Sequence, residues 1–400
     1  MNYLTVRQAA EKWGVSARLV QKYCAGGRIP GAQKFGAAWG IPADAVKPRD
    51  PRAIQAPPPA PPREPSPPQA EESNLMPLLN TAFEPGQCRR TIEEMPPGPR
   101  RDIALAEYWY FSGRPEQAVQ AAELYLTSPD IELRLSACLL CAYANLSLGQ
   151  INRTRMALAQ LKKFLVSETD SPRLRVAQKF AAAAGAVLLH LPLPGGLLHA
   201  PTSLALLPPG LRCFAMYVYA HYAYLQGEYE KSLGVVEATL ALPSRTYPIP
   251  AIYLHMAAVM DCMSLRRPDQ ARAHLLAAWQ LARPDDLIEA FGEHHGLLGG
   301  MLEAELKKNW PEDFKRIIAI TYRFSAGWRG VHNPVTGHDV AGNLTTTEFA
   351  AAMLAARGWT NAEIGQHMNL SPNTVKRHLS SVMQKLHIRH RQELKKYMLQ

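Results

Sequence analysis

A run of prolines divides the chain before any other feature is considered. Eight of the twelve residues at positions 57–68 are proline, and proline lacks a backbone N–H donor and fixes φ near about −65°. Such a run is incompatible with helix or sheet and favours extended polyproline II. A docking ligand for a proline-binding module is the alternative, but the run separates two segments of different composition. The sequence therefore predicts a semi-rigid spacer, assigned to residues 51–74.

The excess positive charge lies at the two ends of the chain. Of a formal net charge of +10, residues 1–50 contribute +5, from eight basic and three acidic side chains, and residues 343–400 contribute the same. Residues 51–342 are therefore neutral overall. This distribution indicates two ends that meet a polyanion and a middle with another role.

Composition excludes several classes of protein. The 400 residues, 47% of them hydrophobic, are too apolar for a wholly disordered chain. No signal peptide or membrane span is expected, because charged residues interrupt the N-terminal segment and no apolar run of about 18 residues occurs. Six cysteines are too few for a disulfide scaffold, and Cys138 and Cys141 are expected to be buried in a helix. We expect a soluble cytoplasmic protein.

The sequence contains no recognisable catalytic or cofactor-binding motif. It lacks a Gly-x-x-x-x-Gly-Lys-Ser/Thr phosphate loop and a Gly-x-Ser-x-Gly nucleophile elbow. The nearest approach to metal ligands is Glu293-His294-His295, together with His332 and His338. Their spacing favours solvated or capping histidines. We therefore expect no enzyme, no cofactor and no metal site.

Residues 75–330 have the pattern of a helical repeat domain. Three apolar segments end in a glycine that is followed five positions later by a small residue, in the pairs Gly113 and Ala118, Gly149 and Thr154, and Gly227 and Ser232. A fourth copy, around Arg266 and Ala271, lacks the glycine, and a degraded copy is expected near residues 185–196. Paired helices need a turn residue that tolerates positive φ and a small residue where they cross.

This period resembles that of tetratricopeptide-type arrays, in which stacked helix pairs form a superhelix with a concave surface. A non-repetitive helical bundle is the alternative. The resemblance implies a sensor domain for a ligand or protein partner that the sequence does not identify. An aromatic cluster could line a ligand groove or pack between the helices: Tyr217, Tyr219, Tyr222, Tyr224 and Tyr229.

The C-terminal basic end contains three helical segments with well-marked starts. Capping boxes begin at Thr345 and Thr360, and the second precedes a short helix over residues 361–368. Ser371 then caps a longer helix over residues 373–386, which has one apolar face and one basic, polar face. A short helix, a tight turn and a longer helix with a basic outer face predict a helix-turn-helix.

This segment resembles the LuxR-type (GerE-like) DNA-binding domain of bacterial transcription regulators over almost its whole length. The matching positions are Leu344-Thr345, Glu348, Gly358, Asn361, Glu363-Ile364, Ser371, Thr374-Val375-Lys376, His378, Lys385-Leu386 and Arg391. At Gly365 the family usually has alanine, so the second helix is expected to be looser by up to about 1 kcal/mol. The resemblance implies a domain that binds double-stranded DNA as a homodimer, with RNA polymerase as a further partner.

The resemblance also implies roles for individual side chains. Lys376, Arg377 and Ser380 are expected to face base edges, while Thr374, His378 and Lys385 are expected near phosphates. Lysine and arginine suit guanine edges, and the free N–H groups at a helix start suit a phosphate. The complete set of expected DNA-binding residues is Ser371, Asn373, Thr374, Lys376, Arg377, His378, Ser380 and Lys385.

The N-terminal basic end forms a second, smaller unit. Thr5 and Ser16 are expected to cap helices over residues 6–13 and 17–24, and two short strands, over 28–35 and 37–41, follow. The small core is expected to include Phe35 and Trp39. This pattern resembles the excisionase/MerR-type winged helix domain. The resemblance implies DNA contacts at Ser16, Arg18, Gln21, Lys22, Arg28 and Lys34. Packing on a protein partner is the alternative.

Together these patterns predict a mainly α protein. It contains a winged helix-turn-helix (1–50), a proline-rich linker (51–74), a tetratricopeptide-like array (75–330), a second linker (331–342) and a four-helix LuxR-type domain (343–400). We expect a sequence-specific transcription regulator controlled by its helical domain. The alternative is an interaction scaffold whose helix-turn-helix units dock proteins; steep salt dependence of DNA binding separates the two.

Overall fold

The computed structural model describes residues 2–48, 73–166, 170–189, 204–242, 245–336 and 344–398. Contacts within the chain divide it into two compact units, Met1–Ala70 and Glu71–Gln400. Nearly all of the predicted proline-rich spacer lies outside the described residues. Within the described ranges, no helix is both long enough and apolar enough to cross a membrane.

The N-terminal unit consists of two helices and a three-stranded antiparallel sheet. Helices α1 (Val6–Trp13) and α2 (Ala17–Ala25) begin at the predicted caps. The Thr5 hydroxyl accepts from the backbone of Gln8, and the Ser16 hydroxyl accepts from that of Leu19, as N-caps do. The strands, which pair in the order β1-β3-β2, are β1 (Tyr3–Thr5), β2 (Gln33–Phe35) and β3 (Ala38–Pro42).

Three details of this unit differ from the sequence prediction. The strand predicted over residues 28–35 was too long, because the Ala32 N–H donates to the Ile29 carbonyl at 3.2 Å in a turn and β2 starts only at Gln33. The strand β1, which was not predicted, pairs with β3 and completes the sheet. The assignment of Phe35 to the core was wrong, because its side chain is 56% exposed and packs edge-on against Tyr3 across Gly40. Trp39 does pack against the core. The sheet therefore presents one aromatic ring to solvent.

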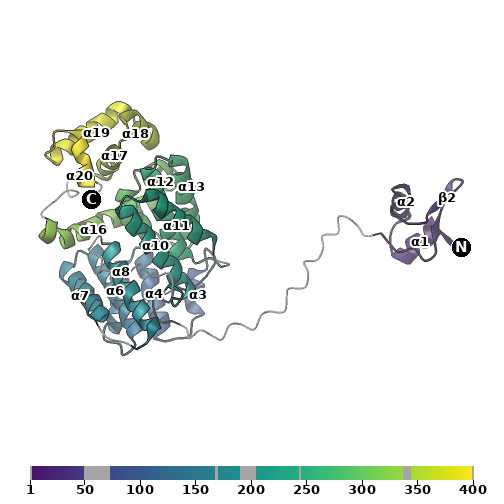
Figure 1. The fold of residues 1–400 in the computed structure, drawn as a ribbon, viewed down its shortest axis with the longest axis horizontal. Coiled ribbons are helices and arrows are strands. Elements are labelled where there is room, and N and C mark those ends of the chain that lie inside the picture. Colours follow the sequence, from purple (N-terminus) through teal and green to yellow (C-terminus); the bar gives the residue numbers. More distant parts are fainter. Residues whose placement is uncertain are drawn as a thin grey trace. The chain divides into compact units, whose positions relative to one another are not determined.

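The second unit is a succession of helices that return on one another (Figure 1). The first helices of successive hairpins are α4 (Pro99–Phe111), α6 (Ile131–Ser147), α8 (Pro172–Val187), α10 (Pro209–Leu225) and α12 (Pro248–Ser264). The second helices are α5 (Pro115–Ala122), α7 (Ile151–Val166), α11 (Tyr229–Ala241) and α13 (Pro268–Ala282). The flanking helices are α3 (Cys88–Glu93), α14 (Glu289–His294), α15 (Met301–Asn309) and α16 (Pro311–Thr336). Because α16 continues to Thr336, the expected linker at residues 331–342 begins inside a helix.

Four of the turns between paired helices share one backbone geometry. Gly113, Gly149 and Gly227 have φ values of 76°, 69° and 77°, and the fourth turn has Arg266 at 60° in place of glycine. In each, the N–H of the next residue donates to the carbonyl five positions before it, at 2.8–3.0 Å. This bond closes the Schellman-type end of a helix. The predicted turn positions are thus confirmed, including the copy without glycine.

The small residues predicted at the helix crossings are fully buried. Ala118, Thr154, Ser232 and Ala271 are each 0% exposed. A small side chain there lets the two helix backbones approach closely. The degraded copy expected near residues 185–196 lies only in part within the described ranges, which stop at residue 189 and resume at residue 204. Kinship with tetratricopeptide arrays stays a prediction.

The first helices of neighbouring hairpins pack on one another, and all five contribute side chains to one interior cavity; the interior that they surround is called the channel below. A buried polar cluster lies beside this cavity, where the Tyr217 hydroxyl contacts His294 Nε2 at 2.7 Å and Tyr253 donates to Glu293 at 2.7 Å. The expectation that these histidines are solvated or capping was wrong. His294 is 3% exposed, and burial lowers its pKa to about 4; His295 is 2% exposed and pairs with Glu303.

The paired cysteines and the candidate metal ligands are the other titratable side chains for which the sequence made predictions. Cys138 and Cys141 are buried in α6, as predicted, and burial raises their pKa values to about 11 and about 12. Among the described residues, no group of three or more His, Cys, Asp or Glu side chains is arranged to hold a metal. The side chains of His332 and His338 lie outside the described part of the chain.

Two glycines of one hairpin, one in the turn and one inside the second helix, give a direct test of this turn geometry. Gly227→Ala is expected to destabilise the chain by about 1–2 kcal/mol, because an L residue at φ 77° is strained although no atom lies within 4 Å of the added Cβ. Gly234→Ala, inside α11 with equally free space, is expected to stabilise by up to about 1 kcal/mol. Urea unfolding followed by circular dichroism measures both. Equal effects of the two substitutions would contradict the turn assignment.

Candidate nucleic-acid interface

The C-terminal part of the chain folds into four short helices, coloured yellow-green to yellow in Figure 1. They are α17 (Thr346–Ala356), α18 (Asn361–Met368), α19 (Pro372–Lys385) and α20 (Leu394–Met398). Both predicted capping boxes are present, with the hydroxyls of Thr345 and Thr360 each accepting from a backbone N–H at 3.2 Å. The predicted starts of α17 and α18 are therefore correct.

The turn between α18 and α19 is tight. Asn369 ends α18 at φ 55°, and Ser371 caps α19 by accepting from the N–H of Thr374 at 3.0 Å. A Cβ added at Gly365 would lie 2.6 Å from the carbonyl oxygen of Leu370. The expectation that glycine merely loosens α18 was therefore incomplete, because the glycine also gives the turn the space it needs.

Helix α19 has two faces with different environments. Val375, Leu379 and Val382 are at most 4% exposed and pack into the domain. The polar face carries most of the predicted DNA-binding residues, of which these are exposed: Ser371, Asn373, Lys376, Arg377 and Ser380. Thr374, His378 and Lys385 are half-buried. The structure thus places a basic, solvent-facing surface on the longer helix.

Lys385 has a partner inside the domain. Its ammonium group donates to Glu348 on α17 at 2.6 Å, and Ser381 donates to the same carboxylate at 2.7 Å. Burial by itself raises the pKa of the Glu348 carboxyl. The hydrogen bonds from Lys385, Ser381 and the Thr345 N–H outweigh this effect and lower that pKa to about 2. Lys385 therefore ties α19 to α17, a contact that was not predicted.

A short helix, a tight turn and a longer helix with an exposed basic face form a helix-turn-helix DNA-binding domain. Residues 342–398 match the model of a known family, described as Bacterial regulatory proteins, luxR family. The C-terminal domain is therefore a LuxR-type helix-turn-helix, which supports a DNA-binding regulator of transcription. Comparison with curated proteins and with solved structures gave no match.

The N-terminal unit displays its predicted contact residues without showing what they bind. All six are exposed, with Ser16, Arg18, Gln21 and Lys22 at or on α2, and Arg28 and Lys34 near or on β2. The guanidinium of Arg28 lies 4.9 Å from the centre of the Tyr23 ring. Their role in DNA binding stays a prediction.

The sequence did not reveal that the C-terminal domain docks on the helical domain. Arg357, at the end of α17, donates to the hydroxyl of Tyr224 on α10 at 2.6 Å and to the carbonyl of Leu297 at 2.9 Å. His367 on α18 contacts the carbonyl of Gly299 at 3.1 Å. The docked faces are thus α17 and α18, while α19 keeps its basic face exposed.

Arg266 makes a further contact across this boundary. Its guanidinium donates to the carbonyl of Gly358 and lies 3.9 Å from Glu363 on α18. This residue occupies the one matching turn in which glycine is replaced. In the sequence, the replacement of the turn glycine by Arg266 was the signal associated with this contact.

Glu348 gives the domain a specific pH dependence. Because its pKa is lower in the folded chain than its usual 4.5, its ion pair stabilises the fold above about pH 4.5 and is lost as pH falls toward 2. Glu348→Gln is therefore expected to lower the melting temperature most at pH 6 and progressively less at acid pH. Thermal unfolding of both chains from pH 6 to pH 3 measures this. Glu237→Gln, at an exposed carboxylate on α11, is the control, and a deficit that does not vary with pH would contradict the assignment.

Proposed function

We propose that the chain is a non-enzymatic, sequence-specific regulator of transcription in the bacterial cytoplasm. The observation that carries this proposal is the exposed basic face of α19 in a LuxR-type domain. Lys376 and Arg377 have the donors that recognise guanine O6 and N7 in the major groove, and Ser380 can bond to any base edge. The capped start of α19 suits a phosphate.

The regulator acts as a homodimer in this proposal. One helix-turn-helix covers a single half-site, and two copies at a fixed spacing read two half-sites about one helical turn apart. The bound dimer then recruits or blocks RNA polymerase. The exposed polar residues of the N-terminal unit add a second DNA contact, which fits the +5 charge of each end.

Control comes from the helical domain through the docking contact. Arg357 and His367 fix α17 and α18, so the orientation of α19 depends on the shape of the helical domain. The reading face is exposed while the domain is docked. A ligand or partner that changes the helical domain therefore acts by re-orienting the two reading helices of a dimer rather than by uncovering them.

The reading helix is tested by single substitutions. Lys376→Ala and Arg377→Ala are each expected to weaken specific DNA binding by about 1–3 kcal/mol, because each removes a charged base contact. Binding to DNA selected from a random pool, measured by fluorescence anisotropy at several salt concentrations, gives the values. Lys162→Ala, at an exposed lysine on α7, is the control.

The same titrations distinguish the regulator from an interaction scaffold. Contacts to phosphates release counterions, so affinity must fall steeply as salt rises. Full affinity in both α19 variants would show that another surface reads the DNA. Binding that is absent at low salt would favour the scaffold.

The docking contact is tested by Arg357→Ala. Losing its bonds to Tyr224 and Leu297 frees the orientation of α19, so a dimer must order two reading helices on binding. We expect affinity for a two-half-site DNA to fall about three- to tenfold and affinity for a single half-site to be unchanged. Tyr224→Phe removes one of these bonds from the opposite side of the contact and is expected to act in the same direction. Unchanged affinity for both DNAs would show that control does not pass through this contact.

A further inference from the structure

A segment that precedes the first helices lies inside the channel of the helical domain. Residues 73–83 contact α4, α6 and α10 and contribute side chains to a cavity shared with α8 and α12. Leu75, Leu78 and Leu79 are at most 1% exposed. All of these are first helices of hairpins, so the segment packs on the side of the helical domain that the first helices form.

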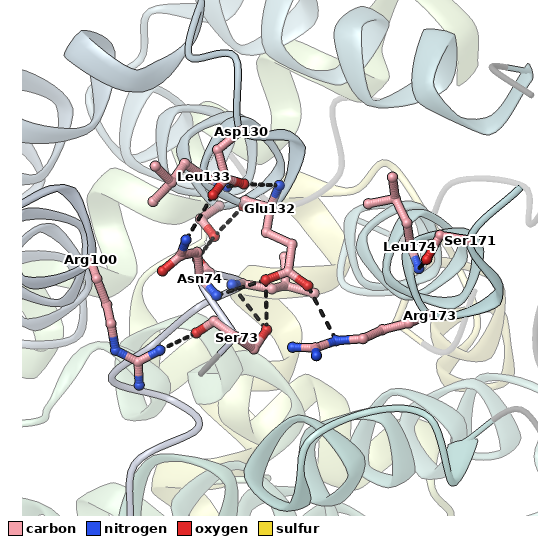
Figure 2. A network of polar contacts seen from close by, with 11 residues as sticks. Ser73, Asn74, Arg100, Asp130, Glu132, Leu133, Ser171, Arg173 and Leu174 are labelled. Atoms are coloured by element: carbon pink, nitrogen blue, oxygen red, sulfur yellow. Dashed lines mark hydrogen bonds and ion pairs between the residues drawn. The ribbon is translucent and has the colours of Figure 1, made fainter. Parts of the chain in front are cut away.

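The helical domain holds the main chain of this segment through side chains. The N–H of Asn74 donates to Glu132 at 2.7 Å, and the Met76 N–H donates to Ser136 at 2.8 Å. Figure 2 shows the first of these contacts, with Arg100 donating to the carbonyl of Ser73 and the Asn74 side chain directed at Asp130.

A single carboxylate receives the next two donors. The N–H groups of Leu78 and Leu79 donate to the two oxygens of Glu107, each at 2.9 Å. Pro77, between Met76 and Leu78, has no N–H to satisfy. Side chains therefore hold a bent segment, in which Met76 has a φ of 44°, and the turn that follows it through backbone N–H groups.

The channel needs an occupant at this place. Glu107 is 0% exposed, and burial raises the pKa of its carboxyl to about 8 while the two amide donors oppose that rise. Removing the segment would leave a buried carboxyl group without these donors, which is costly. Replacing the segment by another peptide that supplies two N–H donors to Glu107 therefore costs less free energy than leaving the carboxyl group without them.

The segment does not fill the channel completely. A cavity of about 40 Å³ remains beside Met76 and Leu79, lined by apolar and aromatic side chains that include Tyr110, Phe180, Phe214 and Tyr253. This space exceeds the roughly 10–15 Å³ that one water-sized group needs, but its lining is apolar. A larger apolar side chain than the one present would find room.

We propose that this channel is a peptide-binding groove and that residues 73–83 are its intramolecular ligand, displaced by an apolar peptide segment of a partner protein. The matching segment has a bend followed by one turn, as residues 75–80 do, with large apolar residues at the positions of Leu75, Leu78 and Leu79. The peptide has no acidic residue at the position that lies next to the Glu132 carboxylate. This inference rests on the proposal that the helical domain binds the regulator's partner, and it names the chemistry of that partner.

The test uses the full chain without DNA and a fluorescein-labelled peptide with the sequence of residues 73–83. The wild-type chain is expected to bind this probe weakly, because the tethered copy competes at a high effective concentration. A chain carrying both Leu75→Ala and Leu79→Ala is expected to bind it at least about tenfold more tightly. Leu242→Ala, at a side chain that is 83% exposed, is the control for leucine loss. Equal affinity of the folded double variant and the wild type would overturn the proposal.

Hydrogen exchange of the wild-type chain covers the case in which the double variant does not fold. The proposal predicts that amides of Leu78 and Leu79 exchange at least about tenfold faster than those in the middle of α6, because the segment opens without the helices. Exchange at the same rate would show that the segment is a permanent part of the core and would overturn the proposal. Because DNA is absent from both measurements, failure here leaves the DNA-binding proposal untouched.

Discussion

A turn residue with positive φ is the constraint on which the helical domain depends. It sends each second helix back along the first, so the first helices pack on one another and surround the channel, to whose cavity each contributes side chains. Glycine adopts this conformation freely, whereas Arg266 has about 1–2 kcal/mol of strain there. Unlike glycine, Arg266 has a side chain at this turn. Its guanidinium contacts Gly358 and approaches Glu363 in the C-terminal domain. The one irregular turn thus provides a contact between the domains.

The helices of the C-terminal domain differ in what they contact. Helices α17 and α18 contact the helical domain, whereas α19 keeps its basic face exposed. Arg357 and His367 engage the helical domain from α17 and α18, and the ion pair between Lys385 and Glu348 connects α17 to α19. A chain of direct contacts therefore runs from Tyr224 in the helical domain through Arg357 and α17 to α19. The occupant of the channel is a second point at which the helical domain can change, because it contacts α4, α6 and α10 at once.

Local features were predictable from the sequence because neighbouring residues determine them. The caps at Thr345, Thr360 and Ser371 follow from residues within three positions, and the turn glycines follow from backbone sterics. The LuxR-type domain was found because its motif is nearly continuous along the chain, and the family match confirms it.

Features that depend on distant residues were not predictable. The packing of Phe35 against Tyr3 across Gly40 depends on a strand, β1, of only three residues. The burial of His294 requires Tyr217, which is 77 positions away, and residues 73–83 are held by carboxylates on two later helices. No local periodicity encodes such contacts. The docking of the C-terminal domain is of the same kind, since Arg357 meets Tyr224 across 133 positions.

In the proposed mechanism, α19 binds DNA while α17 and α18 remain docked on the helical domain. Hydrogen exchange of the full chain, with and without DNA selected from a random pool, distinguishes this arrangement from one in which the domain undocks. We expect slower exchange at the start of α19, near Ser371 and Thr374, and unchanged exchange near Gly299 and across α18. Faster exchange at the docking contact on DNA binding, or no protection of α19, would contradict it.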